Sequence, residues 1–241
     1  MLMMAEKYKK TRDVLHEIKI TDRNNRTDRW LGVQHGELAD MIVTSAIDHH
    51  GLDLVSEQWG TNPDGGDMFG CLDFRTPREQ GIHLPKGVKL SLGVRHSNRG
   101  RFAVSFAVGA RVTVCANGMF VGEFNLKHRH TTGIDLEGLI NGAFDRFLKD
   151  SQQTSAFISD MQQHRLTDQE ASHLIMQAAH QKAMAWKYVE EVFNLYTEPP
   201  HAEFEQRTAW SLYNAFTETA KTMSPVNQFR LLEVLGTLVA N

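Results

Sequence analysis

The sequence predicts an α+β fold, in which a twisted antiparallel β-sheet with one basic face is followed by a C-terminal helical region. Two observations lead to this class. From Val88 onward apolar residues recur at every second position, as in strands, and beyond Asp135 they recur with the period of a helix. Because 241 residues can bury a sizeable core, these parts predict one domain, or one domain with an appendage.

One helix and one hairpin are predicted before the main strands. Residues 35–52 carry apolar residues at helical spacing and include Gly51, a residue type at which helices commonly end. Residues 53–75 predict two strands joined by the turn NPDGGD, because Pro, Asp and Gly supply the backbone angles of a tight reversal.

Three more strands are predicted in the middle of the chain, at residues 88–95, 101–115 and 119–127. The stretch HSNRG predicts the turn between the first two. In these strands the even-numbered residues are mainly apolar, and the odd-numbered residues are mainly small or basic. Since successive side chains of a strand point to opposite faces, we expect the even-numbered residues to meet the core and the odd-numbered residues to share the other face.

The rest of the chain predicts helices at residues 135–163, 167–196, 204–221 and 226–239. Thr167 and Glu170 have the spacing of a capping box, which marks the start of the second helix. Pro199 and Pro200 are expected to end it. The last helix is strongly apolar and predicts either an oligomer interface or packing on its own domain.

Charge is distributed unevenly, although the net charge is only −3. Residues 86–130 contain eight Lys and Arg against one carboxylate, residues 1–30 contain eight against five, and residues 131–241 contain eight against fourteen. We therefore expect a basic N-terminal arm at 1–30, an α+β sheet domain at 31–135, and a helical region at 136–241 that packs on the sheet or forms an interface.

The odd-numbered face is the candidate functional site. Its small Ala, Ser and Gly residues would let a ligand backbone approach, and the cations around them suit phosphates. The alternative is the ordinary solvated face of an antiparallel sheet. The near-absence of acidic residues favours nucleic acid, since solvated faces usually mix both signs. The candidate nucleic-acid-binding residues are Lys86, Lys89, Arg95, Arg99, Arg101, Arg111, Lys127 and Arg129.

Aromatic platforms for base stacking are not evident on this face. The even-numbered Phe102, Phe106, Phe120 and Phe124 are predicted to lie in the core. Stacking residues would have to come from the N-terminal part of the chain, where the candidates are Tyr8, Trp30, Trp59 and Phe69.

Other classes of function receive little support. Cys71 and Cys115 fit neither a disulfide framework nor a CxxC site, which predicts a reducing compartment. The neighbouring histidines at 49–50 and 128–130 have no spaced third and fourth ligands, so no metal or other cofactor is expected. No catalytic signature is present, which favours a binding protein over an enzyme. The N-terminus becomes charged by residue 6, so no membrane association is expected.

The central strands also carry a family resemblance. The run VRHSNRGRFAVSFAVGARVTVCANGMFVG, followed by KHRHT and later by TAWSLYNAFTETAK, resembles an uncharacterised domain family common in phages and plasmids, domain of unknown function 932. The resemblance covers most of residues 30 to 222, and Arg99 stands where the family usually has an acidic turn residue. The positions that match the central motif are Arg111, Cys115, Asn117, Gly118, Met119, Lys127 and His128.

Within this group the size and layout are similar to single-stranded-DNA-binding RNA polymerase cofactors of podovirus-type phages. That similarity implies a protein in the cytoplasm of an infected bacterium that captures melted promoter DNA and recruits the phage RNA polymerase. Its partners would be single-stranded DNA, the polymerase and possible further copies of the chain. The alternative is a phage protein-interaction module that binds or inhibits a host protein without binding nucleic acid.

Overall fold

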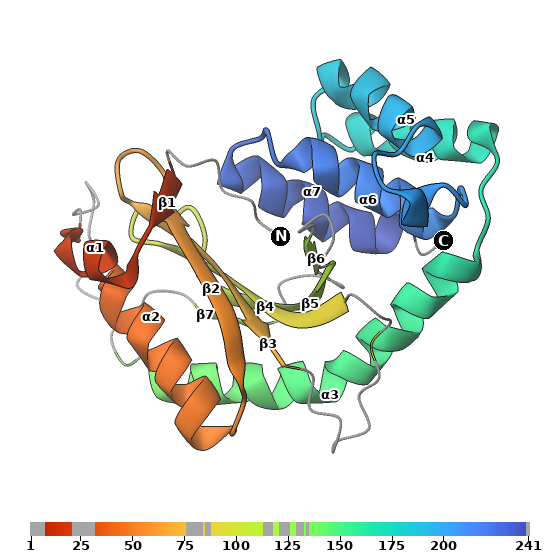
Figure 1. Cartoon of the computed structure of the whole chain (residues 1–241). Helices are drawn as coiled ribbons and strands as arrows, with labels where there is room; N and C mark the ends of the chain where they lie inside the picture. Colours follow the sequence, from red (N-terminus) through yellow and green to blue (C-terminus); the bar gives the residue numbers. More distant parts are fainter. Residues whose placement is uncertain are drawn as a thin grey trace.

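A computed structural model of the chain describes residues 8–20, 32–75, 84, 88–112, 118–120, 126–128, 133 and 135–239. It has three layers, with an antiparallel sheet between two sets of helices (Figure 1). The predicted α+β class is confirmed. In the described part of the chain, no helix is both long and apolar enough to cross a lipid bilayer.

The sheet follows the order β1-β2-β3-β4-β5-β6, with β7 also pairing with β5, and all of these pairs are antiparallel. Strands β2 to β5 are joined in sequence order, so each lies beside the strand that precedes it in the chain. The strands are β1 Lys9–Lys10, β2 Leu54–Thr61, β3 Asp67–Phe74, β4 Val88–Ser97, β5 Val104–Val112, β6 Gly118–Phe120 and β7 Leu126–His128.

The helices divide into those before the sheet and those after it. Helix α2 widens into a π-helical turn, η2, and η4 and η5 are short 3-10 turns. The helices are α1 Arg12–Glu17, α2 His35–Thr44, η2 Ser45–His49, α3 Leu136–Gln163, α4 Asp168–His180, η4 Trp186–Tyr188, α5 Val189–Thr197, η5 Ala202–Phe204, α6 Ala209–Ala220 and α7 Pro225–Leu238.

The even-numbered face of β4 forms a core, as its period predicts. Leu90, Leu92 and Val94 are fully buried. They belong to one apolar cluster with Ile42 of α2 and Phe144 of α3. Each such side chain stabilises the fold by about 1.5 to 3 kcal/mol relative to its exposed state.

The odd-numbered face is covered as well, and this corrects the expectation of an open basic face. Ser91 is 1% exposed and Gly93 is buried. On β3, Phe69 packs against Phe229 of α7 at a ring-centroid distance of 5.3 Å. The small residues of this face therefore allow close approach by the chain's own helices. Helix α7 packs on its own domain, the second of the two alternatives for it, with Leu235 fully buried.

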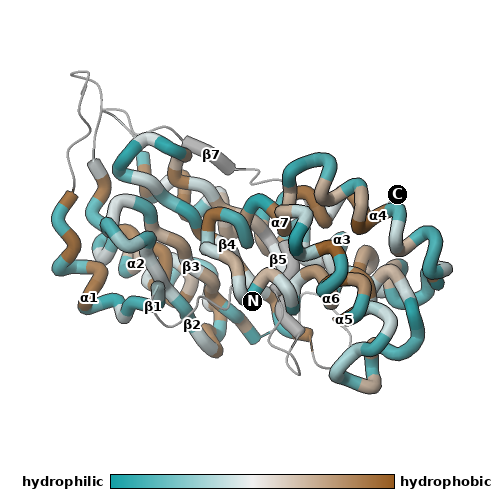
Figure 2. The backbone as a smooth tube through the Cα atoms, turned by 90° about the horizontal axis from the view of Figure 1, so that it is seen from above, coloured by the Kyte–Doolittle hydropathy of each residue, from teal (hydrophilic) through white to brown (hydrophobic). Residues whose placement is uncertain are grey.

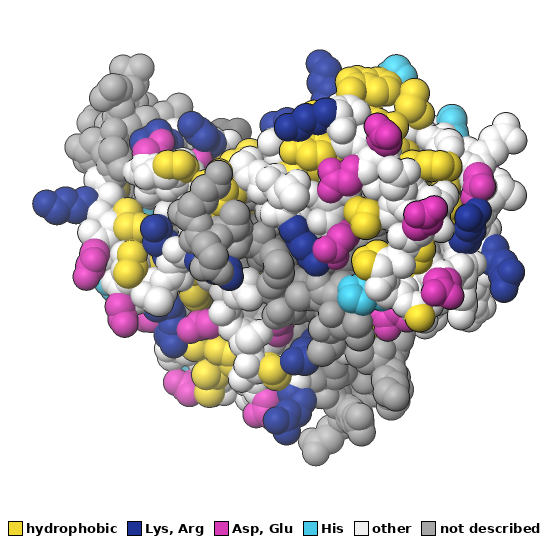
Figure 3. Space-filling model, turned by 45° about the horizontal axis from the view of Figure 1, so that its top comes forward, with side chains coloured by type: hydrophobic (Ala, Val, Ile, Leu, Met, Phe, Trp, Pro, Cys, Tyr) yellow, Lys and Arg dark blue, Asp and Glu magenta, His cyan; other side chains and the backbone are white. Residues whose placement is uncertain are grey.

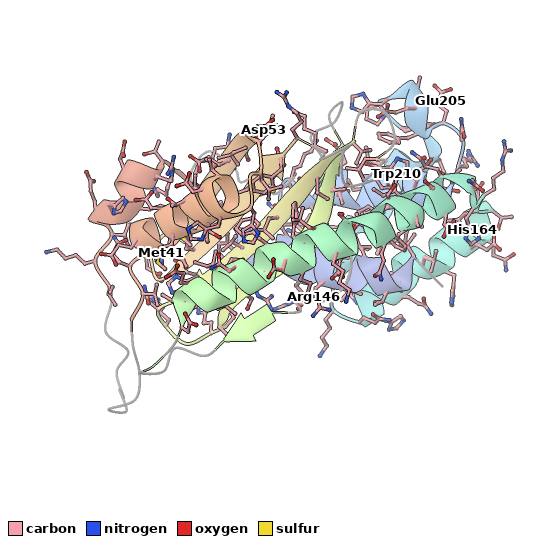
Figure 4. All side chains as sticks on the ribbon, turned by 90° about the horizontal axis from the view of Figure 1, so that it is seen from below. Met41, Asp53, Arg146, His164, Glu205 and Trp210 are labelled. Atoms are coloured by element: carbon pink, nitrogen blue, oxygen red, sulfur yellow. The ribbon has the colours of Figure 1, made fainter. Side chains whose placement is uncertain are left out.

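Helix α3 runs from the sheet to the C-terminal helices. Its first half contributes Phe144 and Phe147 to the core below the sheet, and its second half contributes Ile158 to the core of the helical region. Seen from below, α3 runs along the molecule, with Arg146 inside the helix and His164 just beyond its C-terminal end (Figure 4).

The predicted helix at 167–196 is two helices. Its start is confirmed, because Thr167 and Glu170 form the capping box. Helix α4 ends where Lys182 adopts a left-handed backbone conformation with φ of 58°. There the amide of Ala183 donates to the carbonyl of Ala178 at 3.0 Å, which satisfies the helix end as in a Schellman motif. Glycine usually occupies this position, so the lysine gave no stop signal.

Residues 8–20, which lie within the expected N-terminal arm, belong to the fold. Strand β1 extends the sheet beside β2, and Leu15 of α1 is fully buried against the α2 side. Arg12 donates to Asp40 at 3.0 Å and to Glu57 at 2.9 Å.

Candidate nucleic-acid interface

Two turns lie side by side at one end of the sheet. The β2–β3 turn covers residues 62–66 and the β4–β5 turn covers residues 98–103. They are adjacent because Asp67 of β3 is opposite Ser97 of β4, and the Asn98 amide donates to the Gly66 carbonyl at 2.9 Å. Gly65 and Gly100 have φ near +70°, so each turn uses glycine where other residues would be strained.

Arg99 lies across the two turns. Its guanidinium forms an ion pair with Asp64, and a Cβ on Gly66 would collide with its side chain. The Arg99 and Asp64 side chains are 33% and 41% exposed, respectively. Surface pairs of this kind contribute about 0 to 1 kcal/mol, so a phosphate could replace Asp64 at small cost.

Arg101 has a structural partner. It donates to Asp67 at 3.0 Å, and the Asp67 side chain is fully buried. Asp67 also accepts hydrogen bonds from Ser97 at 2.6 Å and from Asn62 at 3.1 Å. Because the Arg101 side chain is 53% exposed, its outer edge can still meet a ligand while it balances the buried carboxylate.

Arg95 is held between the sheet and α7. Its guanidinium donates to both carboxylate oxygens of Glu233 at 3.3 Å, and its side chain is only 15% exposed. It also lies 5.6 Å from the centre of the Phe102 ring. Arg95 therefore links two layers of the fold, and DNA could reach it only if α7 moved.

The other predicted cations are only partly described. Lys89 is half-buried on β4 opposite Arg111 of β5. Lys127 of β7 is opposite Ser105, but the side chains of Arg111 and Lys127 lie outside the described part of the chain. Lys86 and Arg129 also lie outside the described residues. The structure thus brings Arg99 and Arg101 together on one turn and separates them from Lys89.

Two cations that were not among the candidates lie beside the end of β2, which precedes the β2–β3 turn. Lys9 is exposed, Lys10 is half-buried, and both lie on β1, opposite Gly60 and Trp59 of β2. The basic composition of residues 1–30 was the only sequence signal for them, and it did not indicate where they would lie. We call Lys9, Lys10, Arg99, Arg101 and Phe102 the hairpin rim.

The hairpin rim carries four cations. Two of them, Arg99 and Arg101, pair with the carboxylates of Asp64 and Asp67. Figure 3 shows Lys and Arg side chains together with Asp and Glu side chains over both the sheet end and the helical end. The described cations at this end of the sheet are therefore far fewer than the eight free cations that the sequence suggested.

Phe102 supplies an aromatic ring at this rim. Its prediction as a core strand residue is wrong, because β5 begins at Val104 and Phe102 lies half-buried in the preceding turn. Its ring packs 5.7 Å from that of Phe69. Among the other stacking candidates, Trp59 and Phe69 are buried and Tyr8 is half-buried, whereas Trp30 lies outside the described residues.

A pair of buried histidines lies beneath the turns. The Nδ1 atoms of His35 and His96 are 2.9 Å apart, and His35 Nε2 is 2.7 Å from the Gly65 carbonyl, to which it donates as the neutral Nε2-H tautomer. Burial lowers the pKa of His35, while the Gly65 hydrogen bond and the charge of Asp67 oppose that shift. Neutral His35 therefore supports the β2–β3 turn through its hydrogen bond to Gly65.

A cavity elsewhere in the fold has different chemistry. It measures about 330 Å³ and lies between α2 and α3, beside the π-helical turn η2. Its lining includes Asp40, Glu137, His49 and Met41, the last of which is labelled in Figure 4. Its two carboxylates disfavour a phosphate ligand. Among the described residues, no three His, Cys, Asp or Glu side chains gather as a metal site requires.

Comparison with known proteins adds one match. The sequence model of a family described as "Domain of unknown function (DUF932)" matches residues 24–231. No curated protein and no solved structure matches the chain.

Proposed function

Since the chain belongs to the DUF932 family, which has no assigned activity, we propose from its geometry that it binds single-stranded DNA through the hairpin rim. The observation that carries this proposal is that Arg99, Arg101 and the half-buried Phe102 share the β4–β5 turn, while Lys9 and Lys10 of β1 lie beside the end of β2 at the same end of the sheet. Cations hold the phosphates and an aromatic ring stacks on a base, which is how sequence-tolerant single-strand binders work.

The role that we propose is a phage transcription cofactor and not an enzyme. The chain would capture melted promoter DNA in the cytoplasm of the infected bacterium and recruit the phage RNA polymerase. The resemblance of the central motif and of the C-terminal helix to a family common in phages and plasmids supports this role, as does the similarity in size and layout to phage polymerase cofactors. Self-association on the DNA remains a prediction.

A second function is favoured by the ion pairs. Three of the predicted cations, Arg95, Arg99 and Arg101, already contact carboxylates of the chain itself. This fits a protein that binds or inhibits a host protein without binding nucleic acid. Affinity for DNA and its dependence on salt separate the two functions.

The test measures fluorescence anisotropy of a labelled oligo(dT) of about 20 nucleotides and of a matched duplex, with salt raised from about 50 to 200 mM. We expect the single strand to bind more tightly than the duplex. Four rim cations predict a slope of log affinity against log salt of about −2.8, whereas eight free cations would give about −5.6.

The informative variant replaces Lys9 and Lys10 together with Ala. These side chains project from β1, whose pairing with β2 uses the backbone, so the fold should persist. We expect weaker binding and a slope that is smaller in magnitude by about 1.4. Lys149→Ala, at an exposed position of α3, is the matched control and should leave both quantities unchanged. Absence of binding at low salt would reject the proposed function.

A further inference from the structure

The exposed large apolar side chains of the described residues lie at two ends of the molecule. Val14, Ile20, Ile47 and Val55 belong to the end formed by α1, η2 and β2, whereas Met176 and Trp186 belong to the α4–α5 end. Figures 1 and 2 both place these ends on opposite sides of the molecule. Trp186 is the most exposed of the six, at 51%, and tryptophan is the residue type most enriched at binding hot spots.

The Trp186 ring is held in place although it is exposed. Its ring meets that of His180 edge to face at a centroid distance of 5.0 Å. The next residue, Lys187, lies over the Tyr188 ring at 4.8 Å. A ring that is already ordered loses little entropy when a partner covers it, so this arrangement favours binding.

A depression lies along α5, the helix that follows Trp186 in the chain. It measures about 470 Å³ and follows one face of α5, because its lining residues recur at helical spacing. The lining residues are Lys187, Glu190, Glu191, Asn194, Leu195 and Glu198. A smaller depression between α5 and α6 shares Leu195 and continues over Pro199 and Phe204. The larger depression is therefore mainly polar, and Leu195 joins it to the more apolar lining of the smaller one.

The charges decide the kind of occupant. Three glutamates and one lysine line the depression, so its formal charge is −2. A nucleic acid would be repelled here, and an acidic peptide would be repelled equally. A segment with Lys or Arg around an apolar anchor matches both the carboxylates and the exposed ring.

We propose that the α4–α5 end is a docking surface for a basic protein segment with an apolar anchor, and that Trp186 is its central contact. This surface would give the proposed cofactor its protein-facing side. Its geometry is separate from that of the hairpin rim, so the two proposals can fail independently.

The test measures the affinity of the full chain for a labelled amphipathic peptide with Lys and Leu at helical spacing. A peptide of the same pattern with Glu in place of Lys serves as the comparison. We expect the Lys peptide to bind more tightly, with an affinity that falls as salt rises. Trp186→Ala should weaken binding at least about 10-fold, as loss of a hot-spot residue does. Replacing Glu190 and Glu191 with Gln should weaken binding and reduce its salt dependence.

Ile47→Ala is the control, because Ile47 is 46% exposed at the opposite end of the molecule. It should leave the peptide affinity unchanged, and circular dichroism should show that each variant is folded. Equal binding of the Glu peptide, or an unchanged affinity in Trp186→Ala, would overturn the docking surface. The oligo(dT) affinity of the Trp186→Ala protein should match that of the parent protein. Loss of peptide binding with unchanged DNA binding would support the docking surface and would not contradict the proposed function.

Discussion

Replacing Arg101 with Ala tests whether this arginine is a structural group or only a ligand-binding group. Asp67 is fully buried, and Arg101 is the cation that contacts it, at 3.0 Å. Without Arg101 the carboxylate retains hydrogen bonds from Ser97 and Asn62 but loses its counter-charge. We therefore expect Arg101→Ala to lower the free energy of unfolding.

The magnitude follows from the exposure of the two partners. Removing one member of a fully buried pair costs about 3 to 5 kcal/mol, and a hydrogen bond to a charged group contributes about 1.5 to 3 kcal/mol. The Arg101 side chain is 53% exposed, so water already screens much of the attraction. We expect a loss of about 2 kcal/mol, which is below the range for a fully buried pair and within the range for a hydrogen bond to a charged group.

Urea unfolding followed by far-UV circular dichroism measures this loss. Arg101→Lys keeps the charge, so it should retain about half of the stability that Arg101 contributes. Adding Asp67→Asn to the Ala variant removes the uncompensated charge, so the double variant should lose about 1 kcal/mol less than the sum of the single losses. A loss below about 0.5 kcal/mol in Arg101→Ala, with additive single effects, would refute the reasoning.

Two further predictions concern the same end of the sheet. Burial lowers the pKa of His35 below its ordinary 6.5. The unfolded chain therefore takes up a proton at a higher pH than the folded chain does, so the stability contributed by neutral His35 is complete above pH 6.5 and falls as the pH drops toward the folded-state pKa. Urea midpoints from about pH 5 to 8 should show this decline, and His35→Gln should reduce it; an identical pH profile in that variant would contradict the assignment. Gly70→Ala should destabilise the chain by about 1 to 3 kcal/mol, because a Cβ there would overlap the buried Trp59 ring. A midpoint equal to that of the parent protein would show that the ring can move aside.

Much of the secondary structure could be predicted because it depends on local signals. The period of two marked β4 and β5, and the run NPDGGD marked the turn between β2 and β3. Pro225 marked the start of α7. The break after α4 could not be predicted, because Lys182 takes a left-handed conformation that sequence rules assign to glycine.

The period also showed correctly which side chains share a face, but it could not show what covers that face. The small odd-numbered residues suggested close approach by a ligand. They permit close approach of any group, and in the fold Ser91 and Gly93 are buried while Phe229 of α7 packs on the neighbouring Phe69. Identifying the occupant requires tertiary contacts between residues that are more than 100 positions apart.

The charge pattern likewise could not show which partner the cations would meet. A basic block beside acidic blocks suggested an external polyanion, yet the fold pairs these blocks with each other. Arg99 and Arg101 pair with Asp64 and Asp67, which lie in residues 31–85, a stretch with two Lys and Arg against nine Asp and Glu. Arg95 pairs with Glu233 from the acidic helical region. Charge segregation along a chain therefore predicts complementary surfaces, which the chain itself can satisfy. Only cations outside these pairs, or paired with the guanidinium still partly exposed as in Arg99 and Arg101, can contact DNA at low cost. The salt slope counts such contacts, so it discriminates between the two functions.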